Sequence, residues 1–477
     1  MRILLLLFMS SSAFSQSKQG KIDEFLKQVA DRSVEFKIVV SAGEQSKVLL
    51  SNDLSIFDYQ SNLSAAIDQS SPTPQFGPQQ GLDLTRTATL SADYSKLHKS
   101  GWRSGLSYGL SHSHFDFTPT GTVSAFIPNL ALSASTNLYK DLLSDRLDRI
   151  DQRLMQSKAV IDSQSSLEKK QILIMSLLDL SQLLETNDEI SFQKRLCVEI
   201  RGQTRKLKEK RNRGTINPRD YLLSRKELNT CTSAVMSLEQ LALNQESELL
   251  SKNKLESQDI PQISIETLYQ QVKELYQSLK GQGGNIALDQ QDQIKSLREQ
   301  LKLELLREKD LITQTKPDIT ITIQGGLQGF DANFVDSQED VFSATYPYVQ
   351  AAVNYKLPVE DRIAINSLKA NRIQQITINH RIDQLTSSKQ KRVATLSETL
   401  ERDIIIYDEL EKNVSLSQQI LTIAERDFAN GLLDYTNLSE FQKGLIDSKR
   451  RLATVRAQFI VNAIEYSDFF NYFAKYY

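Results

Sequence analysis

Cysteine is scarce in this chain, with two residues in 477. So few cysteines exclude a fold built on a disulfide framework, although one pair can still bridge in an oxidising compartment. The chain also lacks an excess of charge of one sign, because 57 basic and 59 acidic side chains give a formal net charge of −2. This balance implies no bulk attraction to nucleic acid or to an acidic membrane surface, and we expect no nucleic-acid partner.

The N-terminus, MRILLLLFMSSSAFSQS, has the pattern of a secretory signal peptide over residues 1–15. An apolar run from Ile3 to Met9 follows one basic residue, and the small residues Ala13 and Ser15 precede a plausible cleavage point. No later segment has the roughly 20 consecutive apolar residues that a transmembrane helix requires. We therefore expect an exported chain that is either soluble or a β-barrel.

Glycine and proline are nearly absent from two long stretches. Residues 140–210 contain one glycine and no proline, and residues 359–430 contain neither. We predict a long helix over 140–213 and another over 359–430, each extending roughly 100 Å at 1.5 Å per residue. Each long helix is followed by a break that contains a glycine and then by a return helix. The two return helices are predicted over 218–250 and 437–470. Helices this long belong to coiled coils or tubes rather than to a single globular core.

The two breaks align without gaps at an offset of 217 residues. The aligned pairs are Gly214 with Gly431, Asp220 with Asn437, Leu228 with Leu445, and Val235 with Leu452. Apolar residues recur at 3/4 spacing along these helices, which indicates helix-on-helix seams. The chain is thus predicted to consist of two structural repeats, residues 16–255 and 256–477.

Alternating segments precede each long helix, within about 83–138 and 318–357. The segment DITITIQGGLQGF, for example, places Ile319, Ile321 and Ile323 opposite threonine and glutamine. Segments of about ten alternating residues are typical of outer-membrane barrel strands. The alternative is a β-sandwich domain in which one face of each sheet is exposed to solvent. We predict four strands per chain and leave one more strand-like segment, 83–97, unassigned.

Four strands cannot close a barrel. An open sheet in lipid leaves unpaired backbone groups that cost several kcal/mol each. The sheet must then close with copies of itself, and three copies would supply twelve strands, enough for a lumen.

The doubled pattern resembles the TolC-like outer-membrane efflux protein family. In each half, a long helix ends at a glycine, an acidic or amide residue follows six positions later, and leucine-rich seams continue. The resemblance covers nearly the whole mature chain. It implies a mainly α fold with β structure, in which a trimeric outer-membrane β-barrel continues into a long periplasmic α-helical barrel.

The resemblance also implies a function and partners. A homotrimer in outer-membrane lipid would serve as the exit duct of a tripartite efflux or type I secretion system. An inner-membrane transporter would supply the energy, and a periplasmic adaptor (membrane fusion) protein would connect the transporter to the duct. The exported substrate is not readable from the sequence.

Residue roles follow from the same resemblance. The hairpin tips that meet the adaptor would be Arg213, Gly214, Thr215, Asn430, Gly431 and Leu432. The periplasmic gate would contain Asp220, Asn437 and Glu440. Three positions depart from the family. Asn437 stands where an acid is frequent, Leu433 stands where the family can have a basic residue, and Phe428 stands where the family has an aromatic residue that carries a hydroxyl. The basic run 201–213, with seven basic side chains and one acid, lies beside the first tip.

The two cysteines lie at equal distances from the first tip. The midpoint of Cys197 and Cys231 is Gly214, and antiparallel helices place residues equidistant from their turn at one height. Both cysteines also fall on apolar stripes. A disulfide between them and a pair of buried thiols are both compatible with this placement.

Motifs for catalysis are absent from the sequence. It has no phosphate loop, nucleophile–base arrangement or zinc motif, so we expect no enzyme activity and no cofactor. His112 and His114 share one strand face, but two ligands without a third group are weak evidence for a metal. A structural coiled-coil envelope protein without transport activity is the alternative function.

Overall fold

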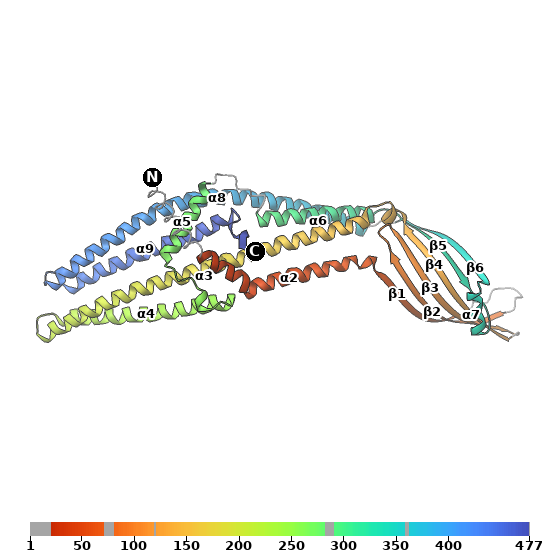
Figure 1. The fold of residues 1–477 in the computed structure, drawn as a ribbon, viewed down its shortest axis with the longest axis horizontal. Helices are drawn as coiled ribbons and strands as arrows, with labels where there is room; N and C mark the ends of the chain where they lie inside the picture. The colour runs from red at the N-terminus through yellow and green to blue at the C-terminus, as the bar shows by residue number, and fades with distance from the viewer. Residues whose placement is uncertain (1–20, 71–80, 119–120, 282–290, 358–361, 477) are drawn as a thin grey trace, which may run out of the picture. The chain divides into compact units, whose positions relative to one another are not determined.

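The computed structural model describes residues 21–70, 81–118, 121–281, 291–357 and 362–476 (Figure 1). The predicted signal peptide, residues 1–15, lies outside the described residues. The chain divides into two compact units. The helical unit comprises residues 1–44, 162–296 and 382–477, and the sheet unit comprises residues 45–161 and 297–381. Each unit therefore draws segments from both halves of the chain.

The sheet unit contains one antiparallel sheet of six strands, in the order β1-β2-β3-β4-β5-β6 (Figure 1). The strands are β1 (Tyr59–Ser70), β2 (Gly81–Leu97), β3 (Trp102–Thr118), β4 (Gly121–Asn137), β5 (Asp318–Gln328) and β6 (Tyr346–Lys356). The prediction of four strands is wrong, because the unassigned segment 83–97 is part of β2 and β1 lies outside the predicted region. In β1, only small residues separate Leu63 from Ile67, and amide residues flank them, so the apolar signal is weak. Pairing of all twelve β1 residues with β2 makes it a strand.

The two faces of the sheet differ in chemistry, since residues paired across strands share a face. One face gathers most of the large apolar side chains, such as those of Leu63, Leu90, Leu106, Leu132, Ile323 and Val353. The opposite face presents mainly small polar side chains, such as those of Ser64, Ser91, Ser107, Ser133, Thr322 and Gln350. The predicted alternation therefore runs across six strands.

A short helix that the sequence did not predict, α7 (Phe334–Phe342), connects β5 to β6. It contacts β4 and β5 at one end of the sheet (Figure 1). The Phe334 and Phe126 rings meet edge to face with centroids 5.6 Å apart. The imidazole of His112 stacks on Phe126 with ring centroids 4.3 Å apart. This histidine is thus part of an aromatic contact in the sheet.

The longer helices are α2 (Val34–Ser51), α3 (Arg146–Asn212), α4 (Pro218–Asn253), α5 (Ile265–Gly281), α6 (Asp292–Gln314), α8 (Arg362–Ala429) and α9 (Tyr435–Asp468). Of these, α3, α4, α8 and α9 correspond to the four helical spans given above. The first long helix was predicted to begin at 140, but Leu138–Leu142 forms a π-helical turn capped by Asn137, and α3 starts after it. The second return helix was predicted over 437–470 and begins instead after its cap, Asp434. Along the described parts of the chain, no helix combines the length and apolar character needed to cross a membrane.

The core of the helical unit is rich in aromatic side chains. Tyr269 stacks on Tyr407 with ring centroids 4.2 Å apart, and the ring of Phe459 lies 5.0 Å from that of Tyr269. Phe473, from the aromatic C-terminal segment, is also buried. Full burial of one such side chain contributes roughly 1.5–3 kcal/mol. The aromatic C-terminus therefore belongs to this core.

A buried ion cluster joins α9 to α3 within the helical unit. The Arg456 guanidinium donates to both oxygens of Glu185, at 2.7 and 3.1 Å, and to Asp188 at 2.9 Å. The arginine side chain is 7% exposed, whereas that of Asp188 is 52% exposed. Burial raises the pKa of Glu185 even though Arg456 acts to lower it. Arg456 is therefore a charged tie between the two halves of the chain.

Candidate functional site

The two hairpin tips have the same backbone geometry. Gly214, after α3, has φ +70°, and Gly431, after α8, has φ +77°. At the first tip, the Gly214 and Thr215 N–H groups donate to carbonyls three and five residues earlier, at 2.9 and 3.0 Å. Gly431 and Leu432 repeat this pattern at 3.1 and 2.9 Å. Both long helices thus end in a Schellman cap, whose left-handed residue is usually glycine.

The return helices begin at equivalent caps. The Asn217 side chain accepts a hydrogen bond from the Arg219 N–H at 3.0 Å, and Pro218 occupies the first helical position. The Asp434 carboxylate accepts one from the Asn437 N–H at 2.8 Å. Side-chain caps and an N-terminal proline are the expected start signals of a helix. Each turn is therefore specified by its own local sequence.

All six residues assigned to the tips are exposed and lie in or beside the two turns: Arg213, Gly214, Thr215, Asn430, Gly431 and Leu432. A Cβ added to either glycine would meet nothing within 4 Å, so the turns are open to solvent. Behind them, a buried cluster that includes Leu207, Leu421 and Tyr435 joins both hairpins.

The predicted gate residues lie in the first turns of the return helices or just beyond them. Asp220 is half-buried in α4, and its N–H donates to the Asn217 carbonyl at 3.1 Å. Asn437 and Glu440 are exposed on α9. In the described part of the chain, no hydrogen bond or ion pair joins these three side chains to one another, and the contacts that join the hairpins belong to other residues.

Glu227 links the two hairpins behind the tips. The Tyr435 hydroxyl and the Ser439 hydroxyl, both on α9, donate to the two oxygens of this α4 carboxylate. Tyr435 is fully buried, and burial together with Glu227 holds the pKa of its phenol above the usual value. Hydrogen bonds to a charged group contribute about 1.5–3 kcal/mol each. This link is not expected from the sequence, although an acid beside Ser224 and Cys231 on a buried stripe is a possible signal.

Amides and hydroxyls extend this link along the helices. The Gln442 side chain donates to Gln203 at 3.1 Å, and Gln203 donates to Glu425 at 3.2 Å. The Thr204 and Ser224 hydroxyls also bond to each other. The first hairpin therefore contacts both helices of the second through polar side chains.

The basic run 201–213 borders a groove beside the first tip. A groove of about 510 Å³ is lined by Lys206, Lys210, Arg213, Glu199, Glu425 and Phe428. The Lys210 ammonium lies 5.7 Å from the centroid of the Phe428 ring. Burial raises the pKa of Glu425, and the nearby Glu199 raises it further. The groove therefore combines basic side chains with two carboxyls, those of Glu199 and Glu425, whose pKa values burial raises.

Cys197 and Cys231 form a disulfide that joins α3 to α4. Their Cα atoms are 5.7 Å apart, and both residues are buried beside Leu196 and Ile200. The bridge therefore links the two arms of the first hairpin at the height that the equal spacing from Gly214 indicated.

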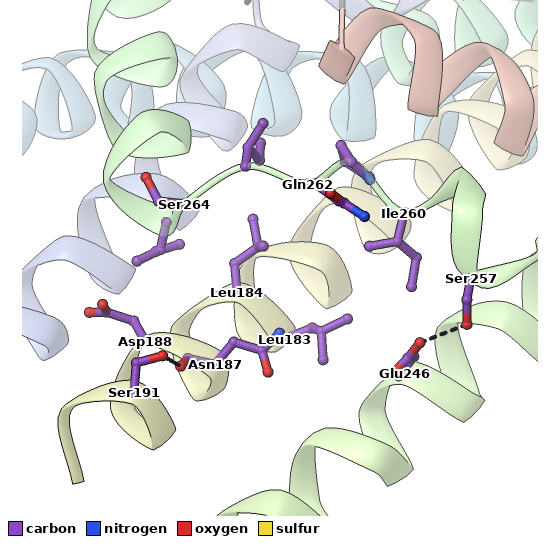
Figure 2. A pocket seen from close by; sticks show the side chains of 13 residues that line it. Leu183, Leu184, Asn187, Asp188, Ser191, Glu246, Ser257, Ile260, Gln262 and Ser264 are labelled. Carbon is purple, nitrogen blue, oxygen red and sulfur yellow. Dashed lines mark hydrogen bonds between the residues drawn. The ribbon is translucent and has the colours of Figure 1, made fainter. Parts of the chain in front are cut away.

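Away from the tips, a cavity of about 340 Å³ lies between α3 and the segment that follows α4 (Figure 2). Its polar groups bond to one another, as Ser257 does to Glu246 and Ser191 to the Asn187 carbonyl, both at 2.9 Å. Across the described residues, no group of three or more His, Cys, Asp or Glu side chains is arranged to hold a metal ion. We interpret this cavity as a packing gap.

Solved structures of outer-membrane channels have the same fold as this chain. The outer-membrane protein VceC of Vibrio cholerae matches with a TM-score of 0.67 and 10% identity, over 94% of this chain and 95% of that one. The Campylobacter jejuni CmeC channel matches with a TM-score of 0.68 and 10% identity, over 94% and 85%. The open Neisseria gonorrhoeae MtrE channel matches with a TM-score of 0.62 and 12% identity, over 95% and 88%.

The mainly α fold with β structure that the TolC-like resemblance implies is thereby confirmed for the single chain. The trimer and the internal repeats stay predictions, and identities this low carry no residue roles. No protein-family model and no curated relative matches the chain.

Proposed function

We propose that this protein is a passive outer-membrane exit channel. Three copies would enclose a barrel in outer-membrane lipid that continues into a helical barrel in the periplasm. An inner-membrane transporter would deliver substrates through a periplasmic adaptor, in an efflux or type I secretion system. On this proposal the protein is not an enzyme and needs no cofactor.

The two-sided chemistry of the sheet carries this proposal. Leu63, Ile67, Val349 and Val353 lie on one face and are between 71% and 84% exposed. A contiguous apolar surface is a liability in water, whereas lipid would cover it favourably. The opposite face, with its serine and threonine rows, suits a water-filled lumen. A sheet with one apolar and one polar face is not expected in a coiled-coil envelope protein without transport activity.

The hairpin tips would form the adaptor site and the gate. Both turns are exposed, and the basic run beside the first turn could attract an acidic adaptor surface in a salt-sensitive way. Asp220 and Glu440 lie six and nine residues past the tip glycines. In a threefold assembly each would recur as a ring of three carboxylates, and such rings select cations.

Planar-bilayer recordings test the channel and its gate together. The purified protein should conduct ions, and its mass in detergent should be that of three chains. The double variant Asp220→Ala/Glu440→Ala should lower cation selectivity, read from reversal potentials across a salt gradient. Asp447→Asn is the control, because it removes an exposed carboxylate of α9 that lies further from the tip.

Each outcome decides one part of the proposal. An elongated oligomer without conductance would support the structural envelope protein instead. Conductance with equal selectivity in wild type and double variant would keep the channel and remove these two carboxylates from the gate.

A further inference from the structure

Both outer edges of the six-stranded sheet are available for pairing. No described strand pairs with the outer edge of β1 or of β6. All twelve residues of β1 are exposed, as are nearly all of β6. An edge strand presents a row of unpaired N–H and C=O groups, which is a template for another strand. In lipid, those groups need partners from protein, since no water is present to bond them.

The directions of the two edges are complementary. Every neighbouring pair in the sheet is antiparallel, and the number of strands is even. β1 and β6 therefore run in opposite directions. When copies are related by rotation about one axis, β6 of one copy meets β1 of the next as an ordinary antiparallel pair. No strand has to be inverted or omitted.

The strands are also staggered in one sense, as closure into a barrel requires. A row of paired residues starts at Tyr59, the first residue of β1, and crosses the sheet to Ala351 through Lys96, Ser104, Ala134 and Ile323. Ala351 lies five residues before the end of β6 at Lys356. An offset of one residue per strand corresponds to a strand tilt of about 35°, within the usual range for barrels.

Opposite charges lie at the same end of the two edges. Asp58 directly precedes β1, Lys356 is the last residue of β6, and both are exposed. If the stagger continues for one more strand, Val353 of one copy pairs with Leu63 of the next. Lys356 then lies within about two residues of Asp58 on the neighbouring strand. Both apolar side chains also stay on the apolar face.

We propose that copies of this chain close through β6 of one copy and β1 of the next, so that each contributes six strands to the barrel. This inference rests on the trimer proposed above, which would then have eighteen strands. Eighteen strands at this tilt and spacing give a backbone diameter of about 34 Å, against about 22 Å for twelve. The additional β1–β2 hairpin widens the barrel.

The wider lumen would carry little charge. Among described side chains, the charged residues on the polar face are Asp68, Asp93, Arg103, Asp318 and Lys356. Each lies within four residues of a strand end. The middle of the wall presents hydroxyl, amide and glycine positions, which suits bulky hydrophilic cargo of either charge. On this arrangement, charge selection belongs to the helical tips.

Cysteine cross-linking tests the closure in the intact protein. Leu63→Cys combined with Val353→Cys should give dimers and trimers on oxidation, resolved on denaturing gels without reductant. Both side chains are exposed, so neither substitution disturbs packing within one copy. The native disulfide is kept, because it is internal to one chain. Each single cysteine variant should stay monomeric on the same gel.

Leu106→Cys with Val353→Cys is the matched alternative. Leu106 lies on β3, on the same face as Leu63, and would meet β6 only if the β1–β2 hairpin stood outside the wall. Cross-links from this pair in a trimer, or none from either pair, would overturn the six-strand closure and leave the trimer intact. If the Leu63–Val353 pair cross-links copies into an oligomer of another size, the six-strand closure stands and the proposed number of three copies is wrong. A single-chain mass in detergent would overturn both.

Discussion

The two helical hairpins share their turns and differ in how their arms are held together. The first, α3 and α4, carries the Cys197–Cys231 disulfide. In the second, α8 and α9, the offset of 217 residues places Val414 and Ser448 at the equivalent positions. There the Ser448 hydroxyl donates to the Gly444 carbonyl of its own helix at 2.9 Å and lies 3.1 Å from the Ser417 hydroxyl across the hairpin. One hairpin is joined covalently, and the other is held by packing and weak polar contacts.

This difference indicates that the hairpins differ in stability. A disulfide stabilises the closed hairpin because it restricts the conformations that the opened arms can adopt. A hydrogen bond between two hydroxyls contributes only about 0.5–1.5 kcal/mol to the stability of the hairpin. We therefore expect the second hairpin to open more readily. Its attachment to the first hairpin includes two half-buried carboxylates, Glu227 and Glu185. If one hairpin moves when the proposed channel opens, α8 and α9 are the better candidates.

The largest effect is expected from removing the charged tie between the hairpins. Arg456→Met leaves the half-buried Glu185 without its cation, and the loss of one partner of a buried pair costs at most about 3–5 kcal/mol. The thermal unfolding midpoint of the detergent-solubilised protein should fall markedly. Arg402→Met is the control, because this arginine is 65% exposed and pairs within its own helix.

A second variant separates the lost tie from a general packing defect. Arg456→Met with Glu185→Met should recover most of the stability, since no uncompensated buried charge remains and Asp188 can face water. Equal midpoints for the single and double variants would show that Arg456 acts through its packing alone.

An intermediate effect is expected from moving the disulfide between the hairpins. Cys197→Ala with Cys231→Ala should destabilise the first hairpin by at most about 3–4 kcal/mol for a loop of this length. Amide hydrogen exchange in α3 and α4 near Gly214 should become at least tenfold faster and approach that of α8 and α9.

The reciprocal variant sharpens the comparison. Val414→Cys with Ser448→Cys lies equally far from Gly431 on both arms, so the pair should bridge and slow exchange in the second hairpin. The wild-type protein, denatured without reductant, should show no reactive thiol. Equal exchange rates in the two wild-type hairpins would contradict the asymmetry.

The smallest effect concerns the feature that the hairpins share. Gly214→Ala and Gly431→Ala should each cost about 1–2 kcal/mol, because alanine pays a steric penalty at positive φ. The two losses should be equal, since both sites are open and have similar φ. Gly444→Ala, inside α9, should instead stabilise its helix by about 0.5–1 kcal/mol. Local exchange near each site measures all three, and unequal losses at the tips would mean that their backbones differ.

The tips were predictable because local rules specify them. Scarce glycine and proline marked the long helices, and Gly214 and Gly431 marked their ends. Helix starts were less certain, since both Asp434 and Asn437 are residue types that favour caps. Strand β1 was missed because small and amide residues surround Leu63 and Ile67. Its pairing with β2 carries that information, and the pairing is not local.

The sequence by itself determined the elements whose causes lie within a few residues. These are the long helices, the glycine turns, the capped returns and the alternation of most strands, which follow from φ preferences, side-chain caps and periodicity. The tertiary structure alone decided that β1 joins the sheet, that Glu227 receives Tyr435 and Ser439, and that Arg456 meets Glu185. The last three contacts join residues 208, 212 and 271 positions apart. No local pattern specifies a partner at such separations, because that choice depends on how the hairpins pack.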